Sequence, residues 1–267
     1  MLKDITLGQY FPGDTFVHRL DPRTKLTVLV LYIALIFTAS TPVTMVIAVG
    51  SLALSVALSH IPPRSLLKGL KPLILIVILT GLLNLFYTDG TVLCQWWIFR
   101  ITREGIFRAV QMVLRIILLV CGTFLLTYTT SPLSITDGLE RILNPFKKIG
   151  LPVHELSMMM SIALRFIPTL IEETDKIMSA QKARGADFET GGILKRAKAL
   201  LPVLVPLFVS AFRRADELAT AMECRCYHGG EGRTRLKQLS MDRSDYLTIL
   251  FWIVLFAAVI VLRTLGL

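Results

Sequence analysis

Residues 26–63, LTVLVLYIALIFTASTPVTMVIAVGSLALSVALSHIPP, run for 38 positions without an Asp, Glu, Lys or Arg. A helix needs about 20 apolar residues to cross the hydrocarbon core of a bilayer, so this stretch is long enough for two crossings. Ser40-Thr41-Pro42 divides it where a tight turn would lie, because proline suits a turn or the first position of a helix. The stretch therefore predicts two membrane-spanning helices joined by a short turn.

The rest of the 267-residue chain extends this pattern. Its composition is 54% hydrophobic with a mean hydropathy of +0.64, which is too apolar for an ordinary soluble domain. Three further stretches without charge are 72–88, 116–136 and 246–262. We expect an all-α polytopic membrane protein with about five transmembrane helices plus long amphipathic cytoplasmic helices. The expected spans are 25–39, 43–60, 70–87, 106–130 and 245–263.

The distribution of charge predicts the topology. The net charge is +10, and 17 of the 29 Lys and Arg residues lie between Asp137 and Asp245. By the positive-inside rule, the N-terminus and this central segment are cytoplasmic, in a multi-pass protein of the cell membrane. This placement accounts for the positive charge without a nucleic-acid partner. The four cysteines give no disulfide framework.

The central segment is too long for a linker and too charged for a span. Its apolar residues recur at helical spacing, which predicts amphipathic helices. These helices are expected at 134–149, 154–184 and 195–225. The predicted domains are 1–130 with four spans, 131–244 with the long amphipathic cytoplasmic helices, and 245–267 with the fifth span.

Two arginines end matching stretches of this segment, 41 positions apart. The shared template is Asp175-x-Ile177-x-x-Ala180-x-x-x-Arg184 and Asp216-x-Leu218-x-x-Ala221-x-x-x-Arg225. One interpretation is that each arginine only complements its own helix dipole, with Gly185 as a helix cap. The pairing favours a second interpretation, in which two arginine forks dock on another protein.

Four ordered motifs resemble the transmembrane T component of energy-coupling factor transporters. The first runs from Gly8 to Lys25, GQYFPGDTFVHRLDPRTK, and the second is Leu164 to Leu170, LRFIPTL. The others are Ala180 to Ala186, AQKARGA, and Arg214 to Glu223, RADELATAME. Together they cover nearly the whole chain.

The resemblance implies a multi-subunit importer of vitamins or metal ions. In this family a T component couples two cytoplasmic ATP-binding-cassette ATPases to a membrane S component that binds the substrate. Two Ala-Arg-Gly motifs at the ends of coupling helices insert into grooves of the ATPases. The resemblance assigns the first motif to Ala183, Arg184 and Gly185, and the second to Cys224, Arg225 and Cys226.

The second motif departs from the family pattern, because cysteines replace both small neighbours of the arginine. Gly tolerates backbone conformations and close approaches that Cys does not, so the packing at this position is in question. The departure also raises a competing interpretation, a metal site formed by Cys224, Cys226 and His228. Against a metal, the Cys-x-Cys spacing is not the usual zinc pattern.

The sequence contains no Gly-x-x-x-x-Gly-Lys-Ser/Thr loop for nucleotide phosphates. We therefore expect a non-catalytic subunit without cofactors, with ATP hydrolysis supplied by partners. The alternative is a permease that holds the substrate itself, as in an ordinary ATP-driven importer. Against it, the predicted spans contain no Asp or Glu beyond Asp245, the first residue of the fifth span. A third possibility is an intramembrane enzyme, but the sequence offers no set of catalytic residues for one.

Two features of the predicted spans and loops remain open. Arg115 lies about ten residues into the fourth span, where it either snorkels to headgroups or bonds carbonyls inside the subunit or at a membrane partner. The outer loop contains Trp96 and Trp97, which we expect to anchor at the membrane interface on a short β-hairpin. A substrate lid is the other interpretation of that loop.

Overall fold

The computed structural model describes residues 10–96, 99–188, 190, 192–229 and 239–266. The chain divides into two compact units. We call the first the membrane unit, formed by residues 8–141 and 238–267, and the second the helix-pair unit, centred on residues 142–237. The helix-pair unit is thus inserted between two parts of the membrane unit along the sequence.

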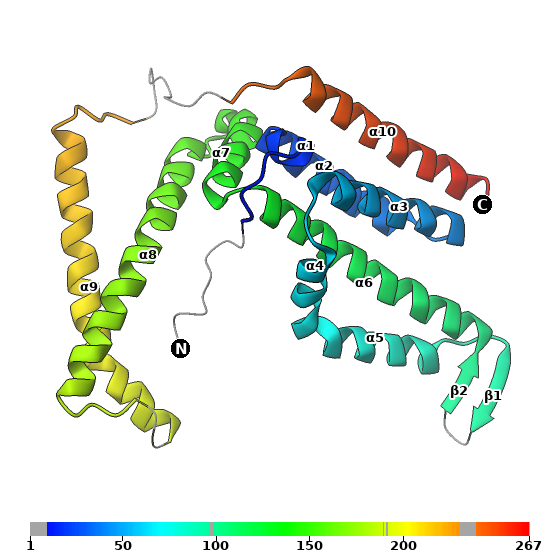
Figure 1. The fold of residues 1–267 in the computed structure, drawn as a ribbon, viewed down its shortest axis with the longest axis horizontal. Coiled ribbons are helices and arrows are strands. Elements are labelled where there is room, and N and C mark those ends of the chain that lie inside the picture. Colours follow the sequence, from blue (N-terminus) through cyan, green and yellow to red (C-terminus); the bar gives the residue numbers. More distant parts are fainter. Residues whose placement is uncertain (1–9, 97–98, 189, 191, 230–238, 267) are drawn as a thin grey trace. The chain divides into compact units, whose positions relative to one another are not determined.

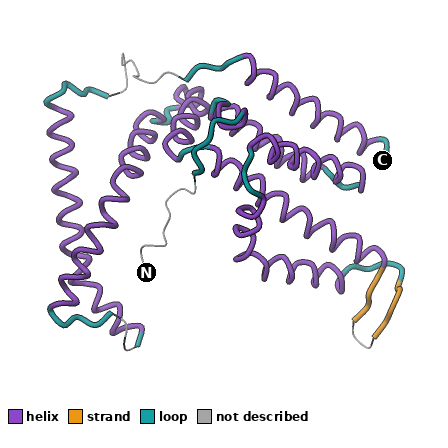
Figure 2. The backbone as a smooth tube through the Cα atoms, viewed as in Figure 1, coloured by secondary structure: helices purple, strands orange, loops and turns teal. Residues whose placement is uncertain are grey.

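Helices dominate both units (Figures 1 and 2). The membrane unit contains α1 (Phe16–Arg19), α2 (Pro22–Thr38), α3 (Pro42–Ser59), α4 (Pro63–Leu70), the 3-10 helix η2 (Lys71–Leu73), α5 (Ile74–Tyr87), β1 (Val92–Trp96), β2 (Phe99–Thr102), α6 (Arg103–Thr129), α7 (Pro132–Leu143) and α10 (Arg243–Thr264). The helix-pair unit contains the 3-10 helix η3 (Asn144–Ile149), α8 (Val153–Ala183) and α9 (Ile193–Glu223). The prediction of an all-α polytopic fold is confirmed.

Four helices of the described chain are long and apolar enough to cross a membrane: Pro42–Ser59, Pro63–Tyr87, Arg103–Thr129 and Arg243–Thr264. They correspond to four of the five predicted spans. The fifth, predicted at 25–39, falls in α2, which has 17 residues and is not one of the four. Its first turn holds Arg23 and Lys25, so its apolar part is at the lower limit of a crossing.

Proline and small polar residues set the helix starts. Four helices begin with a proline, whose fixed φ suits the first helical position: Pro22, Pro42, Pro63 and Pro132. The Asp21 carboxylate accepts the backbone N–H of Arg23 at 2.8 Å, and the Thr41 hydroxyl accepts that of Thr44 at 3.3 Å. The turn predicted at Ser40-Thr41-Pro42 is therefore the junction between α2 and α3.

The core of the membrane unit joins α2 and α10, its first and last long helices. Its buried side chains include Tyr32, Leu35 and Ile36 from α2, Leu118 from α6, and Trp252 and Val259 from α10. The rings of Tyr32 and Trp252 meet edge to face with centroids 5.6 Å apart. Helix α10 therefore packs on α2, although the inserted helix-pair unit separates them in sequence.

The loop between α5 and α6 forms the predicted hairpin. Strands β1 and β2 pair antiparallel, and the register places Trp96 opposite Phe99. Trp97 lies outside the described residues. The hairpin joins α5 to α6, which pack side by side (Figure 1). The prediction of a β-hairpin at this loop is confirmed.

Candidate functional site

The helix-pair unit brings both predicted arginine motifs onto one scaffold. Helices α8 and α9 pack against each other in antiparallel directions (Figure 1). At one level Gln181 Nε2 donates to the Pro202 carbonyl at 3.5 Å, and at another Glu173 binds Arg214. Because each motif lies at the C-terminal end of its helix, the antiparallel pairing sends the two motifs to opposite ends of the pair.

A charged cluster fixes the register of the two helices. Arg214 Nη2 donates to Glu173 Oε2 at 2.8 Å, and the Ser210 hydroxyl donates to Glu173 Oε1. The Ser210 hydrogen bond, and after it the Arg214 guanidinium, lowers the pKa of the Glu173 carboxyl below its usual value. The ionised carboxylate is therefore the form that holds α8 to α9.

The C-terminal end of α8 is a complete Schellman motif. The backbone N–H of Arg184 donates to the Gln181 carbonyl at 3.1 Å, and that of Gly185 donates to Lys182 at 3.0 Å. Ala186 closes the motif by donating to Gln181 at 3.0 Å. Gly185 has φ +88°, in the left-handed region where glycine carries no steric penalty. The Arg184 side chain is exposed on this turn.

The C-terminal end of α9 repeats these bonds. The backbone N–H of Arg225 donates to the Met222 carbonyl at 3.1 Å, and that of Cys226 donates to Glu223 at 2.8 Å. Tyr227 closes the motif by donating to Met222 at 3.1 Å. Cys226 has φ +55°, so a cysteine occupies the left-handed position. The Arg225 side chain is exposed.

The two arginines therefore hold the same position in the same backbone motif. Cys226 is the counterpart of Gly185, and its side chain adds a conformational penalty of about 1–2 kcal/mol that glycine does not have. The repeat in the sequence aligned Cys226 with the capping Gly185 and so put the backbone there in question, but the preferences of cysteine do not predict a left-handed conformation.

The arginines differ in how far they stand from the contacts between the helices. Arg184 follows Gln181 by three residues, whereas Arg225 follows Arg214 by 11 residues. At the rise of an α-helix, the second interval corresponds to ~17 Å. The end of α8 is thus held close to its neighbour, and the end of α9 extends well past the Glu173–Arg214 pair.

The cysteines beside Arg225 gather no metal-binding cluster from the part of the chain that the structure describes. Cys224 and Cys226 are exposed, free thiols. Within the described ranges, no group of three His, Cys, Asp or Glu side chains gathers in a way that could hold a metal ion. The geometry thus gives no support to the alternative of a site formed by Cys224, Cys226 and His228.

One face of α9 is apolar and exposed. Its residues follow the three- and four-residue spacing of a single helix face, with exposed fractions from 43% to 69%: Leu201, Leu204, Val205, Phe208, Val209 and Phe212. Val203, in contrast, is 3% exposed. An apolar strip of this kind beside two charged helix ends is typical of a surface that contacts another protein or lipid.

Arg115 contacts a helix end inside the membrane unit. Its Nη2 donates to the Ala39 carbonyl at 3.0 Å, and Gln111 Nε2 donates to the same oxygen at 3.3 Å. The guanidinium carbon also lies 5.9 Å from the centre of the Phe37 ring. Ala39 is the residue that follows α2, so Arg115 supplies donors to a carbonyl at the C-terminal end of that helix.

A buried polar cluster at the start of α2 was not anticipated from the sequence. Asp245 is 2% exposed and accepts the backbone N–H of Asp21 at 2.9 Å. Lys25 Nζ donates to the carbonyls of His18 and Thr129, each at 3.0 Å. These bonds join the starts of α2 and α10 to the end of α6. The sequence shows the charged residues themselves, but the groups that they bond lie too far away along the chain for residue spacing to pair them.

Comparison with known proteins gives concordant results over nearly the whole chain. The model of the CbiQ family, described as "Cobalt transport protein", matches residues 13–236. A protein of Acidaminococcus fermentans named energy-coupling factor transporter transmembrane protein EcfT is 53% identical over 263 residues, covering 98% of each chain.

Two further relatives carry the same name. The protein of Ruminiclostridium cellulolyticum is 51% identical over 261 residues, covering 96% of this chain and 98% of its own. That of Bacillus subtilis is 49% identical over 265 residues, covering 98% of this chain and 100% of its own. Likeness at this level extends over both the membrane unit and the helix-pair unit.

Proposed function

We propose that this chain, which belongs to the family of energy-coupling factor transporter transmembrane proteins, transmits movement from ATPases to a substrate-binding membrane partner. Its relatives are named as transmembrane components of transporters, in keeping with a non-catalytic role. In this proposal, ATP binding and hydrolysis belong to two cytoplasmic ATP-binding-cassette subunits.

The observation that carries the proposal is the repeated helix end. Arg184 and Arg225 sit at equivalent positions of two Schellman motifs and expose their side chains. A guanidinium at such an end can donate several hydrogen bonds in a fixed geometry to carboxylates or carbonyls of a partner. Two equivalent helix ends suit a pair of equivalent ATPase subunits. Each coupling motif then comprises three residues, Ala183 to Gly185 and Cys224 to Cys226.

The helices between these ends would carry the movement. The Glu173–Arg214 pair and the Gln181–Pro202 hydrogen bond tie α8 to α9, so displacement of one helix end acts on the other helix. The exposed apolar face of α9 fits a second membrane protein, the S component that binds the substrate. The substrate would be a vitamin or a metal ion, and the family description of cobalt transport is compatible with the latter.

The proposed orientation follows from the basic central segment. The helix-pair unit, which holds 15 of the 29 Lys and Arg residues between Lys147 and Lys237 counted inclusively, would face the cytoplasm together with the N-terminus. Both arginines would then be accessible to soluble ATPases. The apolar α9 face would meet the membrane boundary, where an S component could reach it.

Charge reversal at both arginines tests the proposal. The double variant Arg184→Glu and Arg225→Glu replaces donors by repelling carboxylates, so we expect the ATPases to be lost on purification and ATP-dependent uptake to fall to background. Arg213→Glu is the matched control, because Arg213 is also exposed on α9 but lies within the helix. Normal assembly and uptake in the double variant would refute docking through these ends.

The permease alternative makes a different prediction. If this chain held the substrate, the isolated chain would bind labelled vitamin or metal ion saturably without an S component. The coupling proposal expects no such binding, because the substrate site belongs to the partner. Adding the S component to the isolated chain should then produce binding of the labelled substrate.

A further inference from the structure

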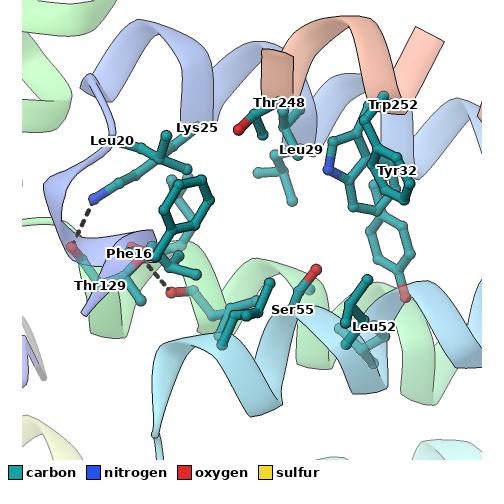
Figure 3. Close-up of a pocket in the computed structure, with 18 of the residues that line it drawn as sticks. Phe16, Leu20, Lys25, Leu29, Tyr32, Leu52, Ser55, Thr129, Thr248 and Trp252 are labelled. Atoms are coloured by element: carbon teal, nitrogen blue, oxygen red, sulfur yellow. Dashed lines mark hydrogen bonds between the residues drawn. The ribbon is translucent and has the colours of Figure 1, made fainter. Parts of the chain in front are cut away.

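A cavity of about 340 Å³ lies within the membrane unit. Its walls come from α1, α2, α3, α6 and α10 (Figure 3). Lys25 and Thr129 lie toward one end of the cavity in this view, and Tyr32 and Trp252 lie toward the other. The volume falls in the range of about 300–1,000 Å³ that is usual for cavities holding small organic molecules.

The polar side chains of the cavity wall direct their hydrogen bonds to nearby backbone carbonyls. Lys25 donates to two of them, and Thr129 donates to Leu125 at 2.8 Å. Ser55 donates to the Ser51 carbonyl at 2.8 Å, and Thr248 donates to the Ser244 carbonyl at 2.7 Å. The remaining wall is mainly leucine, valine and aromatic side chains. An occupant therefore meets a surface that is almost entirely hydrocarbon.

The apolar lining determines which kind of molecule the cavity can hold. A buried water needs two to four polar partners, and the wall directs its polar groups elsewhere. A void of this size left empty would forfeit dispersion contacts over its whole lining, and protein interiors contain few such voids. A flexible hydrocarbon chain suits this cavity, since it makes dispersion contacts with the lining and requires no hydrogen bond from it.

The mouth of the cavity is accessible from the bilayer. Leu54 and Leu58 on α3 and Leu247 and Phe251 on α10 line the cavity and are exposed. Both helices are candidate membrane spans, so lipid chains are the medium that surrounds this rim. Exposed Arg243 begins α10, one turn before Leu247, and places a positive charge near the level expected for a lipid phosphate.

We propose that this cavity binds one acyl chain of a bilayer phospholipid, inserted between α3 and α10. The lipid fills the space that α1, α2, α3, α6 and α10 enclose and acts as a structural ligand. The inference is independent of how the arginine motifs dock, because every residue that lines the cavity belongs to the membrane unit.

Fluorescence of Trp252 reports directly on the occupant. Trp252 is 6% exposed and lines the cavity, and the full chain with Trp96→Phe and Trp97→Phe retains it as the sole tryptophan. Reconstitution with phospholipids brominated on the acyl chain should quench this fluorescence saturably. Ser55→Phe narrows the cavity from α3, and we expect it to weaken the apparent affinity about tenfold. Thr248→Phe narrows the cavity from α10 and should have the same effect.

The matched control is Val46→Phe, on the outer surface of α3, where the side chain is 71% exposed. It should leave quenching unchanged. Equal quenching in the wild type and in every cavity variant that retains its helical circular dichroism would overturn the proposal. Quenching by brominated free fatty acid but not by brominated phospholipid would also overturn it, since the source would then be wrong.

Discussion

The ends of α8 and α9 share one backbone geometry and differ in chemistry. At both ends, three backbone hydrogen bonds turn the chain after the helix and leave an arginine exposed. At α8 the left-handed position is Gly185, and at α9 it is Cys226. The comparison of the two helix ends shows that backbone hydrogen bonds can maintain a Schellman motif where glycine, the favoured residue, is missing. It also provides an internal control, because the same change can be made at both ends.

The largest effect is expected from single charge reversals at the two arginines. Arg184→Glu and Arg225→Glu should each lower ATP-dependent uptake about 10- to 100-fold, the scale of a lost charge-assisted hydrogen bond in a buried contact. We expect Arg184→Glu to be the more damaging, because Gly185 allows a partner to approach more closely than Cys226 does. Uptake assays with matched expression measure both. Equal losses would mean that the neighbouring residue does not shape the contact.

Gly185→Ala tests the backbone at the end of α8. An added Cβ would meet nothing within 4 Å, so the penalty is conformational rather than a steric clash. At φ +88° we expect a local destabilisation of about 1–2 kcal/mol. Amide hydrogen exchange of residues 181–186 measures it as faster exchange. Unchanged protection would show that this turn is not held in the left-handed conformation.

Cys226→Gly makes the opposite change at the end of α9. Removing the side chain relieves the left-handed strain, although glycine also gains entropy in the unfolded chain. We expect a net stabilisation of up to about 1 kcal/mol, seen as slower exchange at residues 222–227. Cys224→Gly is the control, since Cys224 has a helical φ of −58°. Slower exchange in the control alone would contradict the assignment of strain to Cys226.

A smaller, pH-dependent effect is expected where the helices meet. The folded-state pKa of Glu173 is lowered, so its stabilising contribution is present above the unfolded-state pKa and is lost as pH falls through the folded-state value. Glu173→Gln should therefore lower the thermal midpoint at pH 7, with a difference from wild type that shrinks as pH falls from 7 through the lowered folded-state pKa of Glu173. Glu172→Gln is the neighbouring control. A constant difference across this range would argue against ionisation as the source.

The membrane spans and the two helices of the helix-pair unit were predictable from local sequence patterns. Charge-free stretches and proline positions predicted α3, α5, α6 and α10 closely, and helical spacing predicted α8 and α9 within two residues at each end. The 3-10 turn η2, placed between α4 and α5 around Pro72, was not anticipated because a proline can either kink or begin a helix.

Long-range and conformational features of the site were beyond local patterns. The 41-residue repeat aligned Arg184 with Arg225, but the positive φ of Cys226 is set by hydrogen bonds to Glu223 and Met222 rather than by the preference of cysteine. Likewise, the acceptor for Arg115 is the carbonyl of Ala39, 76 positions away. Such a contact depends on how helices pack, which residue spacing within one helix does not specify.

The hydrogen bond from Asp21 to Asp245 has a consequence for biogenesis. It joins residues 224 positions apart, at the first and last long helices of the membrane unit. Because the N-terminal part of the chain leaves the ribosome first, α2 enters the membrane long before α10 has been synthesised. The polar start of α2 must therefore wait for its partner until the entire helix pair has been translated. Insertion of the final helix is thus the step that closes the unit, and a nascent chain stalled before it would expose an unfinished surface to quality-control proteases.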